Sequence, residues 1–162
     1  MIAKNSSVFF ALITFIGVVS LSCNQNKIFD HYCEIPSGVW NQDSLVVFNF
    51  NVLEDSIDYS LNYNIRYSIS YPYYNLYISY YLEDSNGNNI SNELQEIILF
   101  NKKTGEPIGD GLGDLYDLKV ESFKRMSFPY SGKYNFKVKQ FMRTNDLSGI
   151  MSFGLVVDKR KD

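Results

Sequence analysis

The stretch that decides the fold runs from residue 57 to residue 71 and reads IDYSLNYNIRYSISY. Every odd position holds Ile, Tyr or Leu, and every even position holds Asp, Ser, Asn or Arg. Successive side chains of a β-strand point to opposite faces of the sheet, so this period of two gathers the apolar side chains on one face. The segment therefore predicts a strand of an antiparallel sheet with one face in the core and the other in water.

Other segments repeat this alternation or form short apolar runs that are typical of buried strands. Residues 133–139 alternate Lys or Asn with Tyr, Phe and Val, and Met142 continues the apolar row, which predicts a second one-sided strand. Residues 75–82 and 93–101 predict buried strands, the first of them central in its sheet. Further strands are expected at Trp40 and at residues 45–50, 115–121 and 150–158.

These short strands, joined by turns rich in Gly, Pro and Asn, predict an all-β fold because no segment has a convincing helical period. We expect an antiparallel β-sandwich, with a jelly-roll-like arrangement as a variant and a closed up-and-down barrel as the alternative. Pro72 cannot donate to a strand ladder, so residues 71–76 should form a rigid bend between two paired strands. The Asn75 side chain is expected to tie this bend by bonding nearby backbone groups.

The tyrosines between Tyr59 and Tyr81 have two interpretations, because Tyr suits both cores and exposed platforms that stack on sugars or protein partners. We expect the odd-numbered row to lie in the core. Arg66 on the opposite face, and Arg143 at the end of another strand, either pair with carboxylates or hold a partner through bidentate hydrogen bonds.

The N-terminal residues resemble a bacterial lipoprotein leader. Lys4 precedes an apolar run over residues 8–19, which is too short for a permanent membrane helix, and the small residues Ser20 and Ser22 then precede Cys23. We expect cleavage after residue 22 and acylation of Cys23, with an ordinary secretory signal or an uncleaved anchor as alternatives. The predicted organisation is a signal peptide at 1–22, a lipidated tether at 23–31 and one β-sandwich domain at 32–162.

Composition and charge exclude one class of partner. The formal net charge of the chain is −3, and removal of Lys4, the only charge in residues 1–22, leaves −4. An acidic chain without a basic patch lacks the attraction that nucleic-acid binding requires, so no nucleic acid is expected. Because Cys23 belongs to the leader boundary, Cys33 has no partner within the chain, and we expect a packed thiol, with pairing between chains as the alternative.

The glycine-rich residues 105–113 do not predict a phosphate site, because a strand rather than a helix follows them. They predict tight turns or a bulge at a sheet edge. Asp110, Asp114 and Asp117 carry oxygen ligands but lack the spacing of the helical calcium loop, so no metal is expected.

Candidate catalytic groups are few. His31 is the only histidine and is expected to be solvated beside the tether, which leaves metal clusters and histidine-based triads without a basis. Glu83 and Asp84 are adjacent, so they point to opposite faces of a strand and cannot flank one glycosidic bond; we expect loop charges. The sequence therefore predicts neither an enzyme nor a cofactor.

Several motifs in order along the chain resemble one family, the GldH gliding-motility lipoproteins of Bacteroidota. They are YPYYNLY at 71–77, the glycine segment at 105–113, GKY at 132–134 and QFMRTNDLSGI at 140–150, with Trp40, Phe48 and Arg66 at matching positions. Tyr67 and Tyr74 depart from the pattern. The resemblance implies a non-catalytic envelope lipoprotein that is required for gliding and docks with proteins of the gliding and secretion machinery.

The residues that follow Cys23 predict where the lipoprotein is located. Asn24, after the acylated cysteine, is not the Asp that retains lipoproteins in the inner membrane, and the following residues lack an acidic surface-export signal. An outer-membrane lipid anchor with the domain on the periplasmic face is expected. The candidate partner-binding residues are Arg66, Tyr73, Tyr74, Asn75 and Arg143. A carbohydrate-binding β-sandwich lipoprotein is the alternative function.

Overall fold

The computed structural model describes residues 26–160, so the predicted leader and Cys23 lie outside the described residues. In this part of the chain the only helical element is a single turn of 3-10 helix, η1 (Pro36–Gly38), and all other regular elements are strands. The strands are β1 (Lys27–Glu34), β2 (Val39–Asn41), β3 (Val46–Val52), β4 (Asp58–Ser68), β5 (Asn75–Asp84), β6 (Asn89–Ile98), β7 (Asp110–Leu112), β8 (Leu115–Ser127), β9 (Gly132–Gln140), β10 (Asp146–Ser148) and β11 (Ile150–Lys159).

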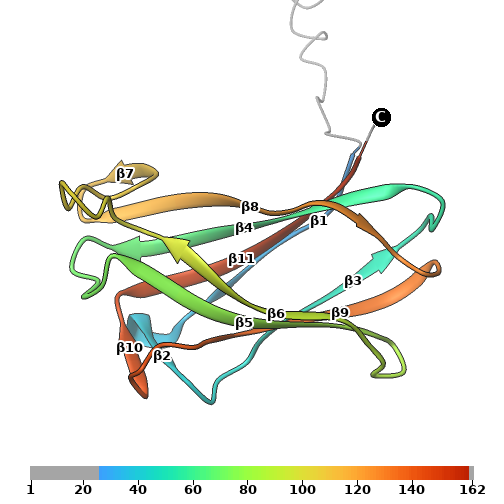
Figure 1. Cartoon of the computed structure of the whole chain (residues 1–162), viewed down its shortest axis with the longest axis horizontal. Coiled ribbons are helices and arrows are strands. Elements are labelled where there is room, and N and C mark those ends of the chain that lie inside the picture. The colour runs from blue at the N-terminus through green and yellow to red at the C-terminus, as the bar shows by residue number, and fades with distance from the viewer. Residues whose placement is uncertain (1–25, 161–162) are drawn as a thin grey trace, which may run out of the picture.

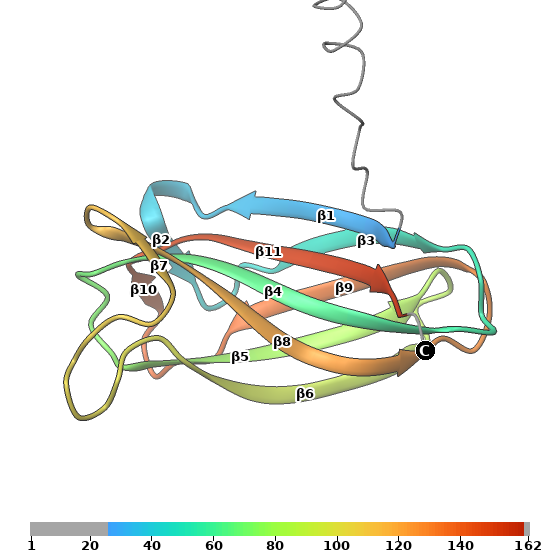
Figure 2. The same cartoon turned by 90° about the horizontal axis from the view of Figure 1, so that it is seen from above.

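Two antiparallel sheets pack face to face and confirm the predicted β-sandwich (Figures 1 and 2). The five-stranded sheet has the order β1-β11-β4-β8-β7, and the four-stranded sheet has the order β3-β9-β5-β6. A short β10-β2 ladder closes one end. The first and last strands pair with each other, so both ends of the described chain leave the sandwich together.

The core forms between the sheets from aromatic and aliphatic side chains of both. Tyr63 of β4 is fully buried, with its ring 5.1 Å from that of Phe153 and 5.8 Å from that of Phe136 across the sandwich. Each buried aromatic side chain stabilises the fold by roughly 1.5–3 kcal/mol. The prediction that the odd-numbered residues of β4 face the core is confirmed for Tyr59, Leu61, Tyr63, Ile65 and Tyr67.

The prediction that the odd-numbered positions face the core is wrong beyond the end of β4, at Ile69 and in β5. Ile69 is 48% exposed, because β4 ends at Ser68. In β5 the even positions face inward, so Tyr80 is buried whereas Tyr77 and Tyr81 are half-exposed on the outer face. The irregular bend changes the core-facing positions from odd in β4 to even in β5. A prediction that extends the period of two across the bend therefore assigns the side chains of β5 to the wrong faces.

The bend at residues 69–74 is also placed differently from the prediction. It does not join two paired strands, because β4 belongs to the five-stranded sheet and β5 to the four-stranded sheet. The buried Tyr71 ties it, by donating its hydroxyl to the Asn75 carbonyl at 2.9 Å. The Asn75 side chain donates instead to the Glu96 carboxylate at 2.6 Å, rather than to backbone groups.

Two edge strands also differ from expectation. β1 begins at Lys27, so most of the predicted 23–31 tether belongs to the sheet; its alternation is faint, since only part of it faces the core. The predicted buried strand at 93–101 is β6, an edge strand that is largely exposed, and Leu99 and Phe100 are buried just after it. Cys33 in β1 is a free, half-buried thiol packed against the core.

Candidate functional site: a groove and a loop end

Arg66 lies on the outer face of the five-stranded sheet in a bidentate ion pair. Its Nε donates to Oδ1 of Asp117 and its Nη2 to Oδ2, both at 2.9 Å. The carboxylate raises the pKa of the guanidinium. Both side chains are about half-exposed, so the pair contributes little to stability, about 0–1 kcal/mol, but holds two charged planar groups in a fixed orientation.

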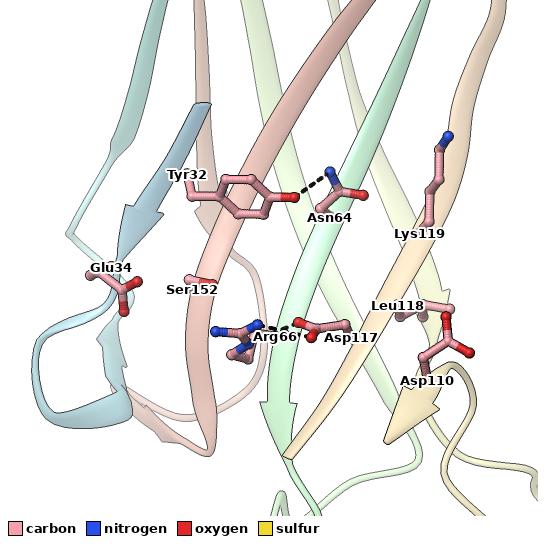
Figure 3. A pocket seen from close by; sticks show the side chains of 9 residues that line it. All are labelled: Tyr32, Glu34, Asn64, Arg66, Asp110, Asp117, Leu118, Lys119 and Ser152. Carbon is pink, nitrogen blue, oxygen red and sulfur yellow. Dashed lines mark hydrogen bonds and ion pairs between the residues drawn. The ribbon is translucent and has the colours of Figure 1, made fainter. Parts of the chain in front are cut away.

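The pair lies in a groove of about 530 Å³ that crosses the strands (Figure 3). Strand register places one residue of each strand in a row through Arg66. From β1 to β7 this row is Glu34, Ser152, Arg66, Asp117 and Asp110. The neighbouring row, from β1 to β8, is Tyr32, Gly154, Asn64 and Lys119.

Tyr32 lies flat across the sheet because its neighbour in the next strand is a glycine. A Cβ atom on Gly154 would be 2.7 Å from Cδ1 and 2.9 Å from Cε1 of the Tyr32 ring, so any other residue would push the ring away. The far end of the ring is held by Asn64, whose Nδ2 donates to the Tyr32 hydroxyl at 3.0 Å. Tyr32 nevertheless remains 50% exposed.

Of the groove residues, the sequence singles out Arg66 as a partner-binding candidate and considers Asp110 and Asp117 only as possible cation ligands. The sequence does not point to Tyr32 and Glu34, because it predicts a tether up to residue 31 and no strand directly after it. The role of Gly154 depends on Tyr32, its neighbour in the adjacent strand, which the sequence alone does not identify. The signal that was available is Asn64, which shares the polar face of the alternating strand with Arg66.

Tyr73 and Tyr74, which are candidate partner-binding residues like Arg66, do not line this groove. They lie in the bend between β4 and β5 and are 41% and 40% exposed. Lys102 Nζ lies 4.5 Å from the centre of the Tyr74 ring, in a cation–π contact.

Other exposed apolar side chains lie at the same end of the sandwich as these tyrosines. The N–H of Ile69 donates to the Asp114 carbonyl at 2.8 Å, which joins the β4–β5 bend to the β7–β8 turn. Leu112 in that hairpin is 89% exposed. We call this surface the loop end; its apolar residues are Ile69, Tyr73, Tyr74, Leu112 and Leu115.

The other two candidate residues differ in exposure. Arg143 is exposed in the loop after β9, at the same end of the sandwich as the β4–β5 bend (Figure 1). Asn75 is only 7% exposed, and its side chain is engaged by Glu96, so the prediction that it contacts a partner gives way to a structural role.

The glycine segment forms turns at a sheet edge, as predicted, and leads into β7. Asp110 and Asp117 are register partners, but the structure gathers no three His, Cys, Asp or Glu side chains into a metal site between residues 26 and 160. His31 is exposed in β1 rather than beside a tether, with its ring 6.2 Å from that of Phe29. Asp84 is not a loop charge: it ends β5 and is 2% exposed.

The fold and these surfaces define a β-sandwich domain whose candidate sites are an open groove and an exposed loop end. No helix in the described residues is long and apolar enough to cross a membrane. The chain belongs to the GldH lipoprotein family, whose pattern matches residues 27–157.

Two relatives match over nearly their whole length. The chain is 32% identical to a gliding motility lipoprotein GldH homolog of Christiangramia forsetii, with 93% of this chain and 96% of the relative covered. It is 26% identical to the gliding motility lipoprotein GldH of Flavobacterium johnsoniae, with 97% and 98% covered. Among solved structures, a family GH115 4-O-methyl-α-glucuronidase gives a TM-score of 0.47 at 9% identity, covering 89% of this chain and 19% of the enzyme; no conclusion rests on that likeness.

Proposed function

We propose that this chain is a non-catalytic gliding-motility lipoprotein, anchored by acyl groups on Cys23 in the outer membrane and facing the periplasm. Membership of the GldH lipoprotein family and the names of both relatives support the motility role. The leader and Cys23 support the anchor, and the absence of an acidic cluster after Asn24 supports the periplasmic address.

Within this role, the domain docks with proteins of the gliding and secretion machinery through the loop end. The observation that carries the proposal is the concentration of exposed apolar side chains there, Leu112, Tyr73 and Tyr74 among them. Exposed apolar patches on soluble domains mark interaction sites, and Tyr and Arg are both enriched among interface hot spots; Arg143 is exposed in the loop after β9, at the same end of the sandwich.

The position of the anchor supports the same surface. β1 begins only four residues after Cys23, so the tether spans at most about 14 Å when extended. The start of β1 and the loop end lie at opposite ends of the sandwich (Figure 2). A domain tethered at the first end presents the loop end away from the membrane, where envelope partners are accessible.

Separate Tyr73→Ala and Tyr74→Ala substitutions test the docking surface. Both side chains are exposed, so each variant should keep its melting temperature within about 2 °C while colony spreading and single-cell gliding fall strongly. Tyr81→Ala is the matched control, because Tyr81 lies on the outer face of the four-stranded sheet, away from the loop end. Gliding at the wild-type level in both variants, or losses that track unfolding, would contradict the proposal.

A further inference from the structure

We propose that the groove across the five-stranded sheet binds a neutral oligosaccharide that lies across the strands. We call it the sheet groove; it is lined by Tyr32, Glu34, Asn64, Arg66, Asp110, Asp117, Leu118, Lys119 and Ser152. Its lining residues differ from those of the loop end, although β7 contributes Asp110 to one and Leu112 to the other, and the proposal does not depend on docking at the loop end.

The Tyr32 ring supplies a fixed stacking platform. One of its faces packs on Gly154, its hydroxyl accepts from Asn64, and half of its surface stays open to solvent (Figure 3). A ring that is already immobilised loses little entropy when a flat apolar face is laid on it. The C–H faces of a pyranose ring match such a surface, because an aromatic side chain is at once apolar and amphipathic.

The polar groups beside the platform are suited to hydroxyls. The Arg66–Asp117 pair is oriented before any ligand arrives and keeps open surface on both side chains, so it offers donors and acceptors side by side. The side chains of Glu34 and Lys119 line the same groove, and the charge of Glu34 adds to that of Asp117 in raising the pKa of Arg66. Adjacent hydroxyls, each both donor and acceptor, can satisfy such a mixed set.

The charge of the sheet groove disfavours anionic ligands. Its lining holds two cations, Arg66 and Lys119, against three carboxylates, those of Glu34, Asp110 and Asp117. Arg66 is already neutralised by Asp117, so a phosphate or a uronate would meet net repulsion instead of an arginine cluster.

The geometry also disfavours a peptide. Addition of a strand needs a free sheet edge, whereas the sheet groove crosses the strands on the face of the sheet. Docking of an amphipathic helix needs an apolar trough, and Leu118 is the only aliphatic side chain in the lining. The volume of about 530 Å³ is in the range of small-ligand sites, and five strands spaced by about 4.8 Å give a groove about 19 Å long.

Isothermal titration calorimetry of the full lipidated chain, in a detergent without sugar head groups, tests the proposal. Cellohexaose and chitohexaose are the neutral probes and hexagalacturonate is the anionic one. We expect at least one neutral probe to bind with a Kd below roughly 1 mM and hexagalacturonate to bind more weakly. No measurable heat from either neutral probe, or preference for the anionic one, would overturn the proposal.

Variants locate the binding and separate it from folding. Tyr32→Ala should weaken binding of the neutral probe by at least about tenfold, whereas Tyr32→Phe, which keeps the ring and loses only the bond to Asn64, should change it by about threefold or less. Tyr81→Ala on the opposite sheet should leave binding unchanged. Equal affinity in folded Tyr32→Ala would place the sugar elsewhere and overturn the assignment.

Motility distinguishes this proposal from docking at the loop end. Loss of gliding in Tyr32→Ala cells without heat from either neutral probe would assign the sheet groove to a protein partner and overturn glycan binding. Loss of gliding in Tyr73→Ala cells with normal sugar binding would support docking and leave the groove assignment standing.

Discussion

Asp84 is a buried carboxylate that organises the turn between β5 and β6. Its Oδ1 accepts hydrogen bonds from the backbone N–H groups of Asn86 and Asn88, each at 2.8 Å, and its Oδ2 accepts from the Asn88 side chain at 2.7 Å and from the Tyr130 hydroxyl. The bond from Tyr130 is the largest cause that lowers the pKa of Asp84, to about 2, while burial opposes it. The same contact raises the pKa of Tyr130 to about 12.

Asp84→Asn should therefore destabilise the fold in a pH-dependent way. The folded pKa lies below the ordinary value of 3.8, so the stabilisation is present above about pH 4 and is lost as the pH falls through about 2. We expect the variant to melt about 4–8 °C lower near neutral pH, and the gap to narrow towards about pH 2. Thermal melts monitored by circular dichroism measure both effects.

Glu83→Gln is the matched control for Asp84, because it removes the neighbouring carboxylate of the same strand. Oε2 of Glu83 accepts one hydrogen bond, from Lys137 Nζ at 2.6 Å, in an ion pair on the outer face, so loss of this carboxylate should shift the melting temperature by a smaller amount. Equal shifts in the two variants, or a gap for Asp84→Asn that does not change with pH, would refute the role assigned to Asp84.

Also at the residue scale, only part of the candidate site could be predicted from the sequence. Arg66 could be predicted because it sits on the polar face of an unambiguous strand. Its partner Asp117 and the platform Tyr32 lie 51 and 34 positions away, and pairing across strands depends on register that no local pattern contains. Asp84 looked like a loop charge because the four donors around it come from a turn and a distant loop.

At the scale of elements, the hairpin of β7 and β8 depends on Gly109. This residue has φ +113°, and a Cβ atom there would lie 2.4 Å from the carbonyl oxygen of Asp117. Gly109→Ala should lower the free energy of unfolding by about 1–3 kcal/mol, because a strained backbone and a backbone clash combine. Denaturant unfolding monitored by circular dichroism measures the loss.

Gly113→Ala in the same hairpin controls for backbone strain alone. Gly113 has φ +64° but open space around its missing Cβ, so its replacement should cost less, about 1 kcal/mol. If the two variants lost equal stability, close contact with β8 would not be the reason for glycine at position 109.

Strand prediction succeeded where burial was one-sided and failed at the edges. β4 and β9 alternate cleanly because a single face of each meets the core. β1 and β6 lie at sheet edges, where partial burial weakens the pattern, so the sequence predicts a tether over most of β1 and a buried strand at β6. The local pattern also does not show that β4 and β5 belong to different sheets. The bend between them is held by residues distant in sequence, because the N–H groups of Leu99 and Phe100 donate to the Tyr74 carbonyl.

At the scale of the whole molecule, the topology sets the direction in which the domain points. β1 pairs with β11, so the chain enters and leaves at one end, and the loop end is the opposite one. The sheet groove lies on the outer face of the five-stranded sheet, nearer to the loop end than to the start of β1. A lipid at residue 23 thus leaves both proposed binding surfaces clear of the attachment point.

Cys23→Ala tests this arrangement, because it removes the proposed acylation site without touching residues 26–160, which contain the described core. Each buried methylene of an acyl chain contributes about 0.8 kcal/mol to membrane binding, so loss of the lipid should move the protein from the membrane to the soluble fraction. Metabolic labelling with an alkyne fatty acid should be abolished, gliding should fail, and the melting temperature should stay unchanged. Cys33→Ala is the matched control: Cys33 is half-buried in β1, so this variant should keep its label and its membrane location. Undiminished labelling of Cys23→Ala, or loss of label in Cys33→Ala, would mean that the anchor is not where the leader places it.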